Sequence, residues 1–135
     1  MSGDCLFVYG TLRRGFEHPM ADLLARQADF IGRGIFQGKL YNLGSYPGVK
    51  TSHRSTDSVV GDVYCLRFPH LLEQFDRYEG YDPDDPAQSM YLRRTVSITL
   101  TNGQTLFAWI YLYNLPIYRY KLIKSGDYLT YLKDR

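Results

Sequence analysis

The sequence predicts an α+β fold: a small, mostly antiparallel sheet, curled or closed into a barrel and flanked by short helices. Several segments alternate apolar and polar residues, or run apolar throughout, as strands do. Other segments begin near a proline and end near a glycine, as helices do. The 135 residues fit one domain with one core, so we expect residues 1–135 to form a single unit.

The second half of the chain carries the clearest strand signals. Residues 92–100 alternate apolar and polar side chains, and Asn102-Gly103 is a typical two-residue hairpin turn. Residues 105–113 are apolar at nearly every position, which places the returning strand in the middle of the sheet. The pattern therefore predicts a β-hairpin in this region.

The first half of the chain predicts shorter strands. Residues 6–9 and 59–68 predict strands. Residues 32–41 predict strand pieces broken by Gly34 and Gly38, and these glycines indicate bulges or close backbone approach. We interpret Tyr46-Pro47-Gly48 as a turn.

Three segments predict helices. Residues 20–28 follow Pro19, and a second helix follows Pro69 and closes at Gly80. A short last helix is expected over residues 127–132. Residues 81–89, rich in Asp and Pro, are expected to form a loop.

Charge and motif content exclude several functional classes. The net charge is +2, with no basic run, so we expect no nucleic-acid partner, and Arg13-Arg14 and Arg93-Arg94 are interpreted as solvated pairs. No stretch reaches the ~20 apolar residues of a membrane helix, and the N-terminus has no signal-peptide pattern. The chain has no nucleotide-binding loop and no serine nucleophile elbow.

Histidine and cysteine spacing predicts neither a metal nor a cofactor. His18, His53 and His70 are scattered, without metal-ligand spacing. Cys5 and Cys65 lack a CxxC pattern, and we interpret them as two reduced core thiols of a cytoplasmic protein. Without a coiled-coil seam, we expect a monomer or a weak homodimer.

Two segments carry residues suited to chemistry. After the first strand, Gly10 allows close approach to the backbone, and the amides that follow can bind a carboxylate or an oxyanion, although an ordinary turn would look the same. Glu79 lies at the end of a predicted helix, where the helix dipole disfavours negative charge by ~0.3–1 kcal/mol and raises the carboxyl pKa. Partial burial beside Tyr78 or the strands would raise this pKa further. Such a group suits a general base near neutral pH, although a surface glutamate at a frayed end fits equally well.

The chain resembles the gamma-glutamylcyclotransferase-like family over nearly its whole length. The resemblance rests on an ordered set of motifs: Val8-Tyr9-Gly10-Thr11-Leu12, Leu40-Tyr41 with Tyr46-Pro47-Gly48, Val60-Gly61-Asp62-Val63-Tyr64, Asp76-x-x-Glu79-Gly80-Tyr81, Tyr91-x-Arg93, Ala108-Trp109-Ile110-Tyr111, and Ile123-Lys124-Ser125-Gly126-Asp127-Tyr128.

The resemblance implies an enzyme that cyclises a γ-glutamyl compound and releases 5-oxoproline and an amine without a cofactor. It implies Glu79 as the catalytic acid/base. It also implies that the substrate is bound by Tyr9, Gly10, Thr11, Leu12, Tyr91 and Tyr113, although Tyr113 fits a core role equally well. The acidic loop 82–86, longer than in several members, is expected to sit over the pocket mouth and select the leaving amine.

Three other functions fit the same residues. A binding module could hold a γ-glutamyl or amino-acid-like ligand without turning it over. A related lyase or acyltransferase could act on a γ-glutamyl-protected metabolite. A structural protein would have a blocked pocket beside Glu79.

Overall fold

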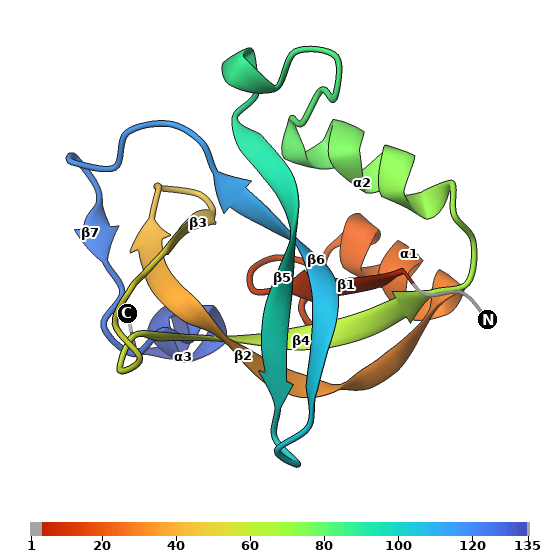
Figure 1. Ribbon diagram of the computed structural model, residues 1–135, viewed down its shortest axis with the longest axis horizontal. Helices are drawn as coiled ribbons and strands as arrows, with labels where there is room; N and C mark the ends of the chain where they lie inside the picture. Colours follow the sequence, from red (N-terminus) through yellow and green to blue (C-terminus); the bar gives the residue numbers. More distant parts are fainter. Residues whose placement is uncertain (1–3, 135) are drawn as a thin grey trace.

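A closed barrel of five strands forms the centre of the computed structural model, which describes residues 4–134 (Figure 1). The barrel strands are β1 (Cys5–Val8), β2 (Ala28–Asn42), β4 (Ser58–Leu66), β5 (Tyr91–Leu100) and β6 (Thr105–Tyr113). Their order is β2-β4-β1-β6-β5, and the pairing of β2 with β5 closes the ring. All of these pairings are antiparallel except the one between β1 and β6. The predicted α+β class and barrel are confirmed.

Strand β2 is one continuous strand of 15 residues, so the predicted break at Gly34 and Gly38 is wrong. The close approach expected at these glycines is confirmed, because a Cβ would lie 2.8 Å from a methyl group of Ile98 at Gly34 and 2.7 Å from the backbone carbonyl oxygen of Lys50 at Gly38. The irregular step in the pairing with β4 falls between Phe30 and Gly32.

Beyond the barrel, β2 pairs with two short strands that the sequence pattern did not predict. These are β3 (Pro47–Thr51) and β7 (Lys121–Leu122). Pro47 and Gly48, interpreted above as part of a turn, are therefore the first residues of β3. The bend precedes them and ends at Tyr46.

The helices are α1 (Pro19–Gln27), α2 (Leu71–Glu79) and α3 (Tyr128–Lys133), as predicted within one or two residues. Figure 1 shows α1 and α2 on the same side of the barrel. Gly80 ends α2 with a left-handed φ of 74°, and its amide donates to the last carbonyls of the helix. The loop after α2 contains one 3₁₀ turn, η1 (Pro86–Gln88).

The core consists of two apolar clusters, one on each side of the barrel wall. Strand β1 shows why: Leu6 and Val8 pack under α1 and α2, whereas Phe7 and Tyr9 belong to the second cluster. A strand buried on both faces needs apolar residues at successive positions. This explains the unbroken apolar runs of β1 and β6.

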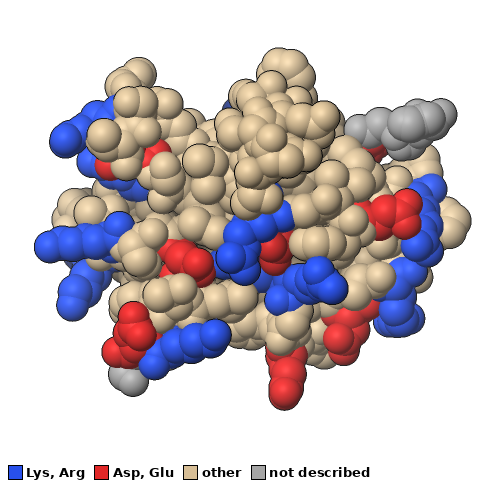
Figure 2. Space-filling model, turned by 90° about the horizontal axis from the view of Figure 1, so that it is seen from below, with Lys and Arg blue, Asp and Glu red and all other residues tan. Residues whose placement is uncertain are grey.

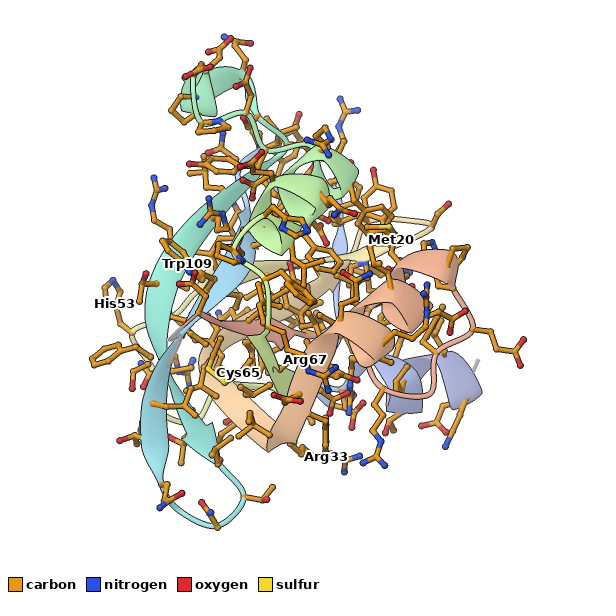
Figure 3. All side chains as sticks on the ribbon, turned by 90° about the vertical axis from the view of Figure 1, so that its right-hand side faces the viewer. Met20, Arg33, His53, Cys65, Arg67 and Trp109 are labelled. Atoms are coloured by element: carbon orange, nitrogen blue, oxygen red, sulfur yellow. A yellow bond between two sulfur atoms is a disulfide. The ribbon has the colours of Figure 1, made fainter. Side chains whose placement is uncertain are left out.

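Cys5 and Cys65 form a disulfide, so the expectation of two reduced thiols is wrong. They are directly opposite each other in the pairing of β1 with β4, with Cα atoms 4.0 Å apart, and both are only half-buried. Figure 3 shows Cys65 on the sheet. Spacing in sequence gave no sign of this contact, because 60 residues separate the pair. The thiols therefore do not support a cytoplasmic location, which remains a prediction.

The surface carries charges of both signs. Figure 2 shows Lys and Arg side chains standing among Asp and Glu side chains on one face, separated by uncharged surface. Of the helices in residues 4–134, none has the length and apolar character needed to cross a membrane.

Reducing the Cys5–Cys65 disulfide should lower the free energy of unfolding by about 2–4 kcal/mol, because the bond closes a loop of some 60 residues in the unfolded chain. Denaturant unfolding with and without dithiothreitol measures the change. The double variant Cys5→Ala/Cys65→Ala is the control and should not respond to the reductant. If the parent protein is equally unresponsive, the bond does not stabilise the protein.

Candidate active site

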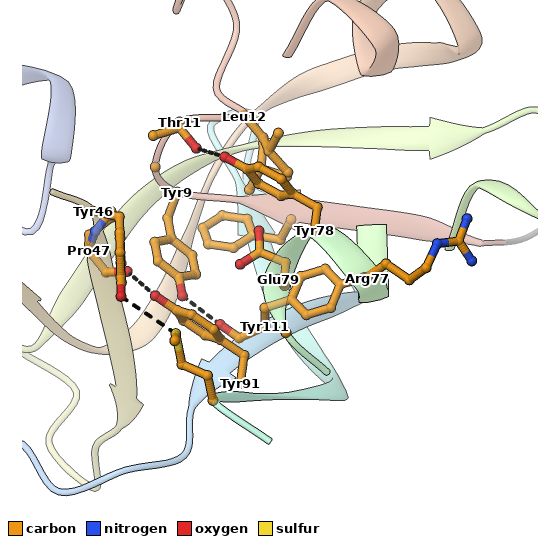
Figure 4. Close-up of a pocket in the computed structure, with 15 residues that line it drawn as sticks. Tyr9, Thr11, Leu12, Tyr46, Pro47, Arg77, Tyr78, Glu79, Tyr91 and Tyr111 are labelled. Atoms are coloured by element: carbon orange, nitrogen blue, oxygen red, sulfur yellow. Dashed lines mark hydrogen bonds between the residues drawn. The ribbon is translucent and has the colours of Figure 1, made fainter. Parts of the chain in front are cut away.

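A cavity of about 360 Å³ lies where the end of β1, the end of α2 and the start of β5 meet (Figure 4). This volume is in the range of small-molecule sites. It is lined by Phe7, Val8, Tyr9, Gly10, Thr11, Leu12, Tyr46, Pro47, Arg77, Tyr78, Glu79, Gly80, Met90, Tyr91 and Tyr111. The structure thus brings Glu79 and the segment after β1, both singled out from the sequence, to one hollow.

Glu79 is the last residue of α2, and its carboxylate points into the cavity (Figure 4). Within the described residues the carboxylate has no hydrogen-bonding partner. Burial raises its pKa from 4.5 to about 8. The sequence argument gave the right direction for this pKa. The main cause, however, is loss of solvent rather than the helix dipole.

Tyrosines from β5, from β6 and from the residue that follows β1 surround Glu79. Burial raises the pKa of Tyr9, Tyr91 and Tyr111 well above the ordinary value, and the nearby Glu79 charge raises each of them further. Tyr78, beside Glu79 on α2, is shifted in the same direction by burial and by Glu79. These phenols stay protonated near neutral pH, so Glu79 is the acid whose charge changes there.

The segment after β1 offers free backbone donors. Within residues 4–134, no acceptor is hydrogen-bonded to the amides of Thr11 and Leu12. The Thr11 hydroxyl lies 2.9 Å from that of Tyr78 at the cavity edge. Gly10 is required by packing, since a Cβ there would lie 2.7 Å from the Pro47 ring. Unpaired amides at a cavity wall can hold a carboxylate or an oxyanion.

Arg13 anchors this segment from behind. It is only 1% exposed, and its guanidinium contacts Asp62 at 3.3 Å and Asp127 at 2.8 Å. The amide of Arg14 donates to the same Asp62 carboxylate. The interpretation of Arg13 as a solvated side chain is therefore wrong. Two aspartates from distant parts of the chain satisfy its charge, which the sequence pattern alone did not pair.

Tyr113 and the acidic loop lie outside the cavity lining. Tyr113 is buried and packs edge-on against Tyr91. In the loop after α2, only Gly80 and Met90, at its two ends, line the cavity. Asp82, Asp85 and neighbouring residues line a second hollow beside Asp76. The roles predicted for Tyr113 and for the loop in substrate selection remain untested.

Tyr111 is the main lining residue that the sequence interpretation missed. Its hydroxyl donates to Asp76 at 2.8 Å, and the same carboxylate oxygen accepts from Arg93 at 2.7 Å. This buried network ties α2, and so Glu79, to the β5–β6 hairpin. The hairpin register contained the signal, since it pairs Arg93 with Tyr111 and Tyr91 with Tyr113 on one face.

No metal-binding cluster is present in the part of the chain that the structure describes, since no three His, Cys, Asp or Glu side chains gather there. The cavity instead offers one carboxylate, several phenols and backbone amides. The site is therefore suited to acid–base chemistry on a small molecule.

Fold and site together define a small α+β barrel protein with one unpaired acid in a cavity of small-molecule size. The family model described as "Gamma-glutamyl cyclotransferase, AIG2-like" matches residues 6–130. The chain belongs to this family, as the motifs indicated, and membership supports a gamma-glutamylcyclotransferase-like activity.

Individual relatives agree with this assignment. MJ1514 of Methanocaldococcus jannaschii is 33% identical over 126 residues, covering 93% of this chain and 96% of that protein. The gamma-glutamylcyclotransferase family protein YtfP of Escherichia coli K12 is 34% identical over 128 residues, covering 92% and 95%. The solution structure of Escherichia coli ytfP superposes with a TM-score of 0.62 at 30% identity, covering 97% of this chain and 99% of that one.

The raised pKa of Glu79 predicts a pH-dependent stability. Because the folded state holds this proton more tightly than the unfolded state, stability should fall as pH rises from 4.5 towards 8. Glu79→Gln removes the charge. The free energy of unfolding of this variant, relative to that of the parent, should therefore rise by at least about 1 kcal/mol between pH 5 and pH 9. Urea unfolding at both values measures it.

The matched control is Glu73→Gln, an exposed glutamate on the same helix, which should track the parent at both pH values. A constant difference between Glu79→Gln and the parent would contradict the raised pKa.

Proposed function

We propose that the protein cyclises a γ-glutamyl compound, releasing 5-oxoproline and a free amine, with Glu79 as the general acid/base. The observation that carries the proposal is the Glu79 carboxylate itself. It is half-buried, has no partner within the described residues, and shares a cavity with the free amides of Thr11 and Leu12. Family membership supports the substrate class.

The reaction joins two atoms of one substrate molecule. Glu79, ionised, takes a proton from the substrate α-ammonium, and the freed nitrogen attacks the side-chain carbonyl carbon. A new C–N bond closes the five-membered lactam while the original amide C–N bond breaks. The protonated Glu79 gives its proton to the departing nitrogen as that bond breaks, because this nitrogen would otherwise be a poor leaving group. The attacking nitrogen gives its second proton to the regenerated Glu79 carboxylate, which leaves a neutral lactam, and this proton passes on to the released amine.

The acidities of the two groups are well matched. An α-amine has a pKa of roughly 8 or above, and burial gives Glu79 a pKa of about 8. Proton transfer between them therefore costs little in either direction. A solvated glutamate, several units more acidic, would be a weaker base.

The segment after β1 supplies binding and charge stabilisation. The amides of Thr11 and Leu12 suit the glutamyl α-carboxylate, and holding that group folds the substrate for attack. Amides at the same wall can also stabilise the carbonyl oxygen as charge develops on it. Arg13, held by Asp62 and Asp127, keeps this segment in place before the substrate arrives.

Replacing Glu79 by Gln should lower turnover by about 10²–10⁴-fold while leaving the fold intact, because general acid–base catalysis contributes that much. Release of 5-oxoproline from a panel of γ-glutamyl compounds is the measurement, with Glu73→Gln as the control expected to match the parent. A Gln variant as fast as the parent would remove Glu79 from the mechanism. Ligand stabilisation without any product would favour a binding module.

The rate should rise with pH through about 8, because the base is active only when ionised and burial sets its pKa there. The measurement is kcat/KM between pH 6 and pH 9.5. His18 lies 3.3 Å from the Tyr78 hydroxyl, so His18→Asn, which can still cap α1, serves as the control. The assignment fails if that variant loses the pH dependence, or if kcat/KM of the parent stays flat from pH 6 to pH 9.5, as it would for a base with the ordinary glutamate pKa.

A further inference from the structure

Two tyrosine hydroxyls in the cavity have their protons committed to the protein. Tyr9 donates to the backbone carbonyl of Tyr111 at 2.6 Å, and Tyr91 donates to that of Pro47 at 2.6 Å. A phenol has one proton and two lone pairs. The Tyr9 oxygen also accepts from the backbone N–H of Val49, so it keeps one free lone pair, whereas the Tyr91 oxygen keeps two. Both oxygens therefore act only as acceptors towards the cavity that these side chains line.

Figure 4 shows the two hydroxyls next to each other, with the Glu79 carboxylate close by. Tyr9 and Tyr91 are close enough that each feels the charge of Glu79. The carboxylate is an acceptor as well when ionised. This part of the cavity thus presents three acceptors from three different parts of the chain: the residue after β1, the start of β5 and the end of α2.

An ammonium group has the opposite character, with three donors and no acceptor. We infer that the Tyr9 hydroxyl, the Tyr91 hydroxyl and the Glu79 carboxylate form a binding site for the α-ammonium of the substrate. The inference rests on the proposed function and deepens it, because it assigns the nucleophile's position and makes Tyr9 and Tyr91 positioning residues.

The cavity is then polarised along its length. The unpaired amides of Thr11 and Leu12 are donors, whereas the tyrosine side offers acceptors. In Figure 4, Thr11 and the two hydroxyls lie on opposite sides of the Tyr9 ring, and the Glu79 carboxylate lies beside that ring. An α-amino acid head group, with its carboxylate at the donors and its ammonium at the acceptors, fits in one orientation. A γ-glutamyl compound that is acylated on its α-nitrogen should not bind at this site, because that nitrogen then carries no positive charge and only one N–H donor.

The test compares two ligands that differ only in the amine, L-glutamate and glutarate, by calorimetric titration of the parent protein. L-glutamate should bind at least about tenfold more tightly, the effect of hydrogen bonds to one charged group. Glutarate binding as tightly as L-glutamate would overturn the inference, and this arm needs no variant.

Tyr91→Phe keeps the ring but removes the acceptor, so the affinity ratio of the two ligands should fall at least about fivefold while glutarate binding stays unchanged. Tyr64→Phe, a buried tyrosine outside the cavity lining, is the matched control and should keep the ratio. An unchanged ratio in Tyr91→Phe contradicts the assignment. If the ratio behaves as expected but no γ-glutamyl compound is turned over, the ammonium site stands and the proposed function falls.

Discussion

The pairing of β2 with both β4 and β5 is the constraint on which the site depends. Gly34 and Ile35 lie opposite β4 residues and also opposite β5 residues, and this double pairing closes the barrel. Closure of the barrel holds β6 and β5 on the side of β1 opposite to β4. Tyr91 and Tyr111 therefore line the same cavity as Tyr9. The extension of β2 beyond the barrel carries β3, whose first residue supplies the carbonyl that binds Tyr91.

Buried charged side chains that hold the structure together have partners in this fold, whereas the proposed catalytic side chain has none within residues 4–134. Arg13 is matched by two aspartates, and Asp76 by Arg93 and Tyr111. Such pairing is the rule, because a buried charge without a partner is costly. Glu79 is the exception in the cavity, with burial as the only cause of its raised pKa. The other buried charges are paired within the protein, whereas the Glu79 carboxylate faces the cavity. A ligand that enters the cavity can therefore reach a reactive acid.

The sequence pattern predicted the features that depend on neighbouring residues, namely helix ends and the hairpin turn. Proline and glycine set the ends of α1 and α2, and Asn102-Gly103 set the β5–β6 hairpin, so these elements appeared where expected. Long-range contacts were not predictable in this way. The Cys5–Cys65 bond and the burial of Arg13 depend on strand register and on partners far along the chain. Glu79 and the segment after β1 were found through motif order, whereas Tyr111 required the hairpin register.

The contact between Arg13 and Asp127 can form only late in the synthesis of the chain. The segment that forms one wall of the cavity is synthesised well before its second aspartate, which lies 114 positions later in the chain. Until then the guanidinium has only Asp62, and the wall lacks half of its support. This wall of the cavity therefore gains its full support only when Asp127, at the start of α3, has been synthesised and has paired with Arg13.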